Sequence, residues 1–155
     1  MSLPVYDSIH EGSLILLGRK HNWEELPQII NGDLKFGDKV NIGEISKLKC
    51  VQEIYGDLDI STSYVKSFRG IGNKTLRLID GNLFTNTAVD SNILGVLLIR
   101  ELKYFFAHND RSLARSTGNV EPFEIVNRYI ADGSRDIFEC QIELIDKGYE
   151  SFAHM

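Results

Sequence analysis

The chain has 155 residues, of which 17 are Lys or Arg and 22 are Asp or Glu, so its formal charge at pH 7 is −5. This acidic balance argues against direct nucleic-acid binding, which needs a basic surface. Hydrophobic residues at 43% and charged residues at 25% are ordinary values for a globular chain of this length, so a packed core is expected rather than disorder.

The N-terminal segment, the most apolar stretch and the cysteines together indicate the cellular compartment in which we expect the protein. The segment Met1 to Asp7 has neither the basic nor the apolar region of a secretory signal, and the apolar stretch 93–99 is too short to cross a bilayer. Cys50 and Cys140 form no C-x-x-C pair and lie in apolar segments, which favours buried thiols in a reducing compartment. We therefore expect a cytoplasmic protein that makes no membrane contact.

An alternating apolar pattern recurs in the first half of the chain. A glycine precedes two apolar positions separated by one residue in 12–16, 32–36 and 56–60, and the stretch 74–78 keeps the alternation without the glycine. Such alternation predicts short strands with one buried face. The first apolar positions of these strands are 18 to 24 residues apart, and they are Leu14, Leu34, Leu58 and Leu76.

The segments between these strands have a different period. Ile45, Leu48 and Val51 are three residues apart, a spacing that suits a 3₁₀ or loosely helical segment with one apolar edge. Each unit is therefore predicted to be a strand, a turn and a short helical return. Stacked units would share one continuous core.

This pattern resembles the leucine-rich repeat, L-x-x-L-x-L-x-x-N-x-L. Residues 58–65 and 76–83 match its central part, with Ser63 and Gly81 at the asparagine position. The Gly-Asp-Leu-x-Ile form also resembles degenerate leucine-rich-like repeats of bacterial and phage proteins. The resemblance spans roughly residues 9 to 84 and implies a β-solenoid of about four units. No unit carries the asparagine that hydrogen-bonds the turn, Lys39 interrupts the second unit, and an open β-sheet packed on helices is the alternative fold.

From Asp90 onward the apolar period becomes helical. We expect a buried helix from Asp90 to near Ala107, a second helix from Pro122 to Gly133, and a third that begins near Ser134. The apolar stripe of the third helix is predicted at Phe138, Ile142, Ile145, Tyr149 and Phe152. The fold class is thus α+β, with a leucine-rich-repeat-like solenoid over residues 1–89 and a helical cap over 90–155 in one structural unit.

No catalytic or metal motif is present in the sequence. The stretch Arg69 to Thr75 looks like a phosphate loop, but Asn73 separates its last glycine from the lysine, so a turn is predicted instead. The histidines are widely scattered and form no H-x-H or H-E-x-x-H motif. We therefore predict no catalytic residues, no metal site and no cofactor.

Three surfaces are candidates for binding. The outward strand positions Ile15, Lys35, Asp59 and Arg77 should lie side by side, with Ser13, Asp33, Asp57 and Thr75 beside them. The loop 107–119 carries cationic side chains that could hold a carboxylate or phosphate. The third helix carries an acidic stripe that could steer a basic partner. The plainer interpretations are a solvated sheet face, a linker and a solvated helix face. The predicted binding residues are Asp33, Lys35, Asp57, Asp59 and Arg77 on the strands, His108, Arg111 and Arg115 in the loop, and Glu139, Glu143, Asp146 and Glu150 in the stripe.

These features favour a non-enzymatic protein-binding module, by analogy an inhibitor, immunity or anti-defence factor. A second hypothesis is a small enzyme that acts on a phosphorylated or nucleotide substrate through the loop from His108 to Arg115. A third is a structural or assembly subunit that forms a homodimer through the helical cap.

Overall fold

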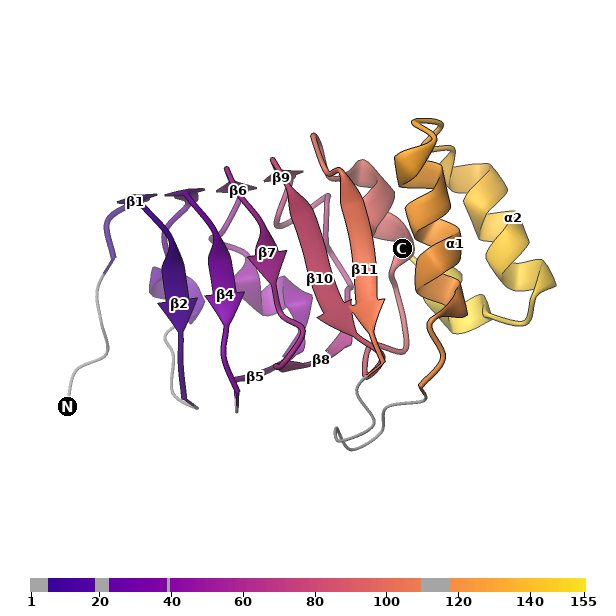
Figure 1. Cartoon of the computed structure of the whole chain (residues 1–155), viewed down its shortest axis with the longest axis horizontal. Helices are drawn as coiled ribbons and strands as arrows, with labels where there is room; N and C mark the ends of the chain where they lie inside the picture. Colours follow the sequence, from indigo (N-terminus) through magenta and orange to yellow (C-terminus); the bar gives the residue numbers. More distant parts are fainter. Residues whose placement is uncertain (1–5, 19–22, 39, 110–117) are drawn as a thin grey trace.

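The computed structural model describes residues 6–18, 23–38, 40–109 and 118–155. It is an α+β fold in which short parallel strands are followed by two α-helices (Figure 1). The strands are β1 (Ile9–Glu11), β2 (Leu14–Leu16), β3 (Ile29–Asn31), β4 (Leu34–Phe36), β5 (Asn41–Glu44), β6 (Glu53–Ile54), β7 (Leu58–Asp59), β8 (Tyr64–Ser67), β9 (Leu78–Ile79), β10 (Asn82–Asn86) and β11 (Tyr104–His108). The α-helices are α1 (Glu121–Ala131) and α2 (Ile137–Asp146), and the 3₁₀ helices are η1 (Trp23–Glu25), η2 (Ile45–Leu48), η3 (Leu94–Leu98) and η4 (Glu150–Ala153).

The strands form three sheets in the described part of the chain. One has the order β1-β3-β6-β9, one has the order β2-β4-β7-β10-β11, and β5 pairs with β8. All of these pairs are parallel, and each strand pairs with the equivalent strand of the next coil. The chain therefore advances as a stack of coils from β1 to β11, with the two α-helices beyond β11 (Figure 1).

The five-stranded sheet confirms the predicted strands of the first three units. Leu14, Leu34 and Leu58 are in register and buried, while Ile15 and Lys35 between the buried positions are exposed. The alternation works because successive side chains of a strand point to opposite faces. The short return is also confirmed at η2, whose Ile45 and Leu48 are buried.

The predicted fourth unit was wrong. Leu58 pairs with Leu83, not with Leu76, and the next strand along adds Phe105 to the same buried row. Leu76 is buried, but its φ of 51° places it outside any strand, and Leu78 pairs with Glu53 in the four-stranded sheet. The sequence 81–83 repeats the Gly-x-Leu pattern of the earlier units, and the uneven unit length concealed this repeat.

Glycines make the corner between the two larger sheets possible. A Cβ added at Gly56 would lie 2.6 Å from the carbonyl oxygen of Gly32, and one at Gly81 would lie 2.7 Å from the carbonyl oxygen of Gly56. Backbone of one coil thus contacts backbone of the next, and only glycine leaves room for such an approach.

Side chains that follow these glycines join the coils. The Asp57 amide donates to Asp33 Oδ1 at 2.7 Å, and the Asn82 amide donates to Asp57 Oδ1 at 2.8 Å. At the first corner the Asp33 amide donates to Ser13 Oγ at 3.1 Å. We call these hydrogen bonds between successive coils the ladder. A carboxylate is a stronger acceptor than a neutral oxygen, so the ladder holds the strands on either side of the corner in register.

Asn86 at the end of β10 joins the turn that follows it to the preceding coil. Its side-chain amide donates to the carbonyls of Ser61 at 2.9 Å and Ser63 at 2.8 Å, and its Oδ1 accepts from the Ala88 amide at 3.0 Å. The register that pairs Phe84 with Asp59 places Ala88 at the position equivalent to Ser63, so Asn86 lies two residues before the asparagine position of the leucine-rich-repeat pattern. A buried amide that bridges two coils supplies hydrogen bonds the turn could not otherwise make.

The predicted helix from Asp90 to Ala107 was also wrong. This segment contains only η3 and the strand β11, so it forms one more coil. Asn92 and Glu101 have φ values of 61° and 68°, which an α-helix cannot contain. Gly95 sits where an added Cβ would lie 2.5 Å from the Ile71 carbonyl oxygen. The apolar side chains from Ile93 to Leu97 line the interior of a coil, whereas Tyr104 and Phe106 on β11 are exposed.

The helices α1 and α2 confirm the second and third predicted helices, and they cover the last coil. Asn127 of α1 accepts from the Phe105 amide at 2.8 Å, on the edge of β11 that faces away from β10. Arg135 donates to the carbonyls of Ile99 and Leu102. Phe123 packs between Phe105 and Phe152, with ring centroids 5.7 and 5.8 Å away. Asp136 caps α2 by accepting from the Glu139 amide.

The glycine corner can be tested with two alanine substitutions. Gly56→Ala should lower the free energy of unfolding by about 1–3 kcal/mol, since the new methyl group overlaps backbone of the preceding coil. The control Gly37→Ala should lower it by less than about 0.5 kcal/mol, because its methyl group meets only the movable end of the exposed Leu17 side chain. Urea denaturation measures both values, and equal losses would contradict the close approach at the corner.

Candidate functional site

The outward side chains of the five-stranded sheet form one row across five strands. Strand register aligns Ile15, Lys35, Asp59, Phe84 and Phe106. Ile15 and Phe106 are 58% and 57% exposed, so large apolar side chains lie near both ends of the row. We refer to this row, with its neighbours Leu17 and Tyr104, as the outer face.

The C-terminal end of the outer face is aromatic. Tyr104 is 57% exposed on β11, and Phe84 and Phe106 stand side by side on β10 and β11. Beside them, a groove of about 340 Å³ between β11 and α1 is lined by Phe106, Phe123 and Arg128, among others. Aromatic residues and arginine are enriched at protein interfaces, and aromatic rings present large contact areas with few rotatable bonds.

The structure places the predicted strand-face residues in different environments. The carboxylates of Asp33 and Asp57 accept backbone amides of the next coil, as described above. Asp59 accepts from the amide and the hydroxyl of Ser61, at 2.9 and 2.6 Å. Lys35 is exposed in the middle of the row, next to Asp59 on the adjacent strand.

Arg77 does not lie in this row, so its predicted position beside Asp59 was wrong. Its amide donates to the Gln52 carbonyl at 2.8 Å, just ahead of the four-stranded sheet. There it lines an open cavity of about 540 Å³ together with Gln28, Lys49 and Cys50. Phe84 occupies the position that had been assigned to Arg77, an exchange of a cation for an aromatic ring.

The described residues include only part of the predicted polar loop. His108 is exposed at the end of β11 and pairs in register with Asn86. Arg111 and Arg115 lie outside the described residues. Ala107, which had been placed at the end of a helix, is instead buried within β11.

The acidic stripe is divided between exposed and engaged carboxylates. Glu139 and Asp146 are exposed on α2, and Glu150 is exposed at the start of η4. Glu143 accepts from Arg128 and from the Tyr129 hydroxyl, the latter at 2.9 Å. The hydrogen bond from Arg128 lowers the pKa of Glu143, whereas burial, followed by the hydrogen bond to Glu143, raises the pKa of Tyr129 to about 12. Glu143 therefore joins α2 to α1.

The part of the predicted apolar stripe that lies on α2 faces outward. Phe138, Ile142 and Ile145 are 69%, 44% and 43% exposed, while Cys140 and Leu144 of the opposite side are buried. Tyr149 and Phe152, which complete the predicted stripe, are half-buried against the core. The chain bends after Asp146, so the stripe does not continue along one helix. Three large apolar side chains next to Glu139 and Asp146 form a second exposed surface.

Apart from these surfaces, the described residues contain few reactive groups. No three potential metal-binding side chains gather there, and no helix there has the length and apolar character needed to cross a membrane. Burial raises the pKa of the Cys140 thiol to about 12, so it stays protonated. No known protein family, curated protein or solved structure matches the chain.

The contact of Glu143 with Arg128 gives a pH-dependent prediction. A carboxyl group whose pKa is lowered by folding stabilises the fold above its ordinary pKa of 4.5, and this contribution disappears as the pH falls through the lower folded value. Glu143→Gln should therefore lower Tm by about 1–3 °C at pH 7 and by much less near pH 2.5.

Glu139→Gln is the control, because it makes the same change at an exposed position of the same helix. It should leave Tm nearly unchanged at both pH values in scanning calorimetry. Indistinguishable results for the two variants would show that Glu143 does not join the two helices.

Proposed function

We propose that the chain is a non-enzymatic protein-binding module built on a leucine-rich-repeat-like solenoid. The solenoid assignment is supported by parallel register from coil to coil and by the short 3₁₀ return at η2. Solenoids present repeated strand positions as one continuous surface, and they commonly bind partners there.

The observation that carries the proposal is the outer face. Its five aligned backbone positions are fixed by strand register and by the ladder at the corner, so little backbone freedom remains to be lost on binding. Phe106 and Tyr104 supply apolar anchors at one end, while Lys35 and Asp59 supply a polar centre. A protein partner with an apolar patch and complementary charges fits this arrangement. The small size and acidic charge suit an inhibitor, immunity or anti-defence factor.

Affinity capture with matched variants tests this proposal. The tagged full chain and its Phe106→Ser variant are used to capture proteins from the native cell lysate, and bound proteins are measured by quantitative mass spectrometry. A partner bound through the outer face should be retained at least about tenfold less by the variant, since truncation of an aromatic anchor commonly costs 2 kcal/mol or more.

Tyr55→Ser is the matched control, because Tyr55 is an aromatic residue 45% exposed beside the four-stranded sheet. It should retain the partner as the unchanged chain does. Both substitutions are at exposed positions, so circular dichroism should show the same fold in all three proteins. Equal retention by the two variants would remove the outer face from the proposal.

A second candidate function is assembly through the helical cap. It is favoured by the outward stripe of Phe138, Ile142 and Ile145 on α2. Adjacent exposed apolar residues are typical of a protein interface, and a two-fold dimer would use the same stripe on both copies.

Light scattering coupled to size-exclusion chromatography tests the assembly candidate. The unchanged chain should become dimeric as its concentration rises from micromolar to near-millimolar, and Ile142→Glu should keep it monomeric by placing a charge within the stripe. Asp146→Asn, which changes a polar neighbour of the stripe, should leave dimerisation intact. A chain that is monomeric over the whole range excludes this candidate.

A further inference from the structure

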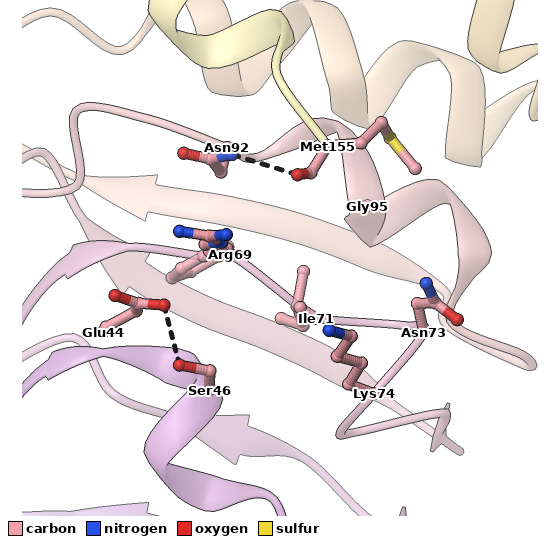
Figure 2. A pocket seen from close by; sticks show the side chains of 11 residues that line it. Glu44, Ser46, Arg69, Ile71, Asn73, Lys74, Asn92, Gly95 and Met155 are labelled. Carbon is pink, nitrogen blue, oxygen red and sulfur yellow. Dashed lines mark hydrogen bonds between the residues drawn. The ribbon is translucent and has the colours of Figure 1, made fainter.

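A cavity of about 440 Å³ lies on the side of the molecule formed by β5, β8 and the segment 69–74 (Figure 2). Its volume is in the range of small-molecule sites. Figure 2 shows Glu44 and Ser46 on one side of the cavity and Asn92 on the opposite side. Arg69 and Lys74 lie between them, on the segment 69–74. None of these residues belongs to the outer face.

The loop from Gly70 to Thr75 is held in one conformation. The carbonyl oxygen of Gly70 accepts from the amides of Asn73, Lys74 and Thr75, at 3.3, 2.8 and 3.2 Å. The buried Thr75 hydroxyl bonds to the carbonyls of Leu48 and Val51 in the preceding coil. Since these amides are engaged within the loop, an anion in the cavity has to be bound by side chains rather than by the backbone cradle of a phosphate loop.

The side chains that could bind an anion are Arg69 and Lys74. Both are exposed, and neither forms an ion pair within the part of the chain that the structure describes. Glu44 is the acidic residue among the lining side chains, and its carboxylate accepts from the Ser46 hydroxyl at 2.8 Å. Among the lining side chains, the two cations Arg69 and Lys74 outnumber the single carboxylate of Glu44. Across the cavity, the main-chain oxygen of Met155 accepts from the Asn92 side chain at 3.2 Å.

The same cavity has an apolar wall. Met155, which is 53% exposed, supplies its apolar surface, and the buried side chains of Phe68 and Ile71 lie behind the polar residues. A free phosphate ion would fill only a small part of the volume and would leave this wall uncovered. A ligand that combines a doubly charged oxyanion with a small apolar group would contact both parts of the cavity.

We propose that this cavity binds a small phosphomonoester. The phosphoryl oxygens are bound between Arg69 and Lys74, and the organic part contacts the exposed side chain of Met155. A phosphomonoester carries close to two negative charges at neutral pH, which matches two cationic side chains, and arginine binds phosphoryl oxygens with two parallel hydrogen bonds. This site is separate from the protein-binding face proposed above and does not depend on it.

Titration calorimetry of the full chain with phenyl phosphate tests the site. Phenyl phosphate should bind the unchanged chain with a dissociation constant in the millimolar range or below, and phenol and benzoate should bind at least tenfold more weakly. Arg69→Gln and Lys74→Gln should each weaken the binding of phenyl phosphate by about tenfold or more, because each removes one charge-assisted contact. Each variant is first checked for an unchanged Tm, and either one alone is sufficient for the comparison.

Lys66→Gln is the matched control, because Lys66 is exposed on β8 and does not line the cavity. It should leave the affinity unchanged. The proposal is overturned if phenyl phosphate does not bind the unchanged chain, if benzoate binds as tightly, or if Lys66→Gln weakens binding as much as Arg69→Gln. The last result would mean that only the overall charge attracts the ligand.

Discussion

The close contact of backbone with backbone at the glycine corner is the constraint on which the rest of the structure depends. Gly32, Gly56 and Gly81 let successive coils approach so closely that no side chain fits between them. The carboxylates of Asp33 and Asp57 then reach the amides of the following coil. Spacing and register of the five-stranded sheet are both set at this corner, so the alignment of the outer face follows from it.

Strand alternation was readable from the sequence wherever the Gly-x-Leu pattern was intact. The first three units were found because an apolar residue at every second position has one simple meaning, a strand with one buried side. The fourth failed because Leu76 and Leu78 also alternate, although their backbone belongs to the return and to the other sheet. Local alternation cannot distinguish these cases, whereas the corner glycine at position 81 could have done so.

The candidate sites were less predictable, because they depend on which side of an element the core occupies. A fully apolar segment such as 93–99 fits a buried helix and the inside of a coil equally well, and the difference lies in backbone angles at Asn92 and Glu101. For α2 the apolar period was read correctly, but the period alone did not show that Phe138 and its neighbours are exposed while Cys140 and Leu144 are buried. Phe84 and Phe106 could be identified as outer-face residues only from the strand register, which the sequence does not show.

The two ends of the stack differ in how their last hydrogen-bonding groups are satisfied. At one end Asn127 and Arg135 engage the backbone of the final coil, whereas β1 and β2 have a neighbouring strand on one side only within the described residues. In a nearest-neighbour stack, each coil is stabilised by the coils it touches, so local opening requires least free energy where one neighbour is missing. The amides of β2 should therefore exchange with solvent deuterium before those of β10, and the molecule should lose its coils in order from the N-terminal end.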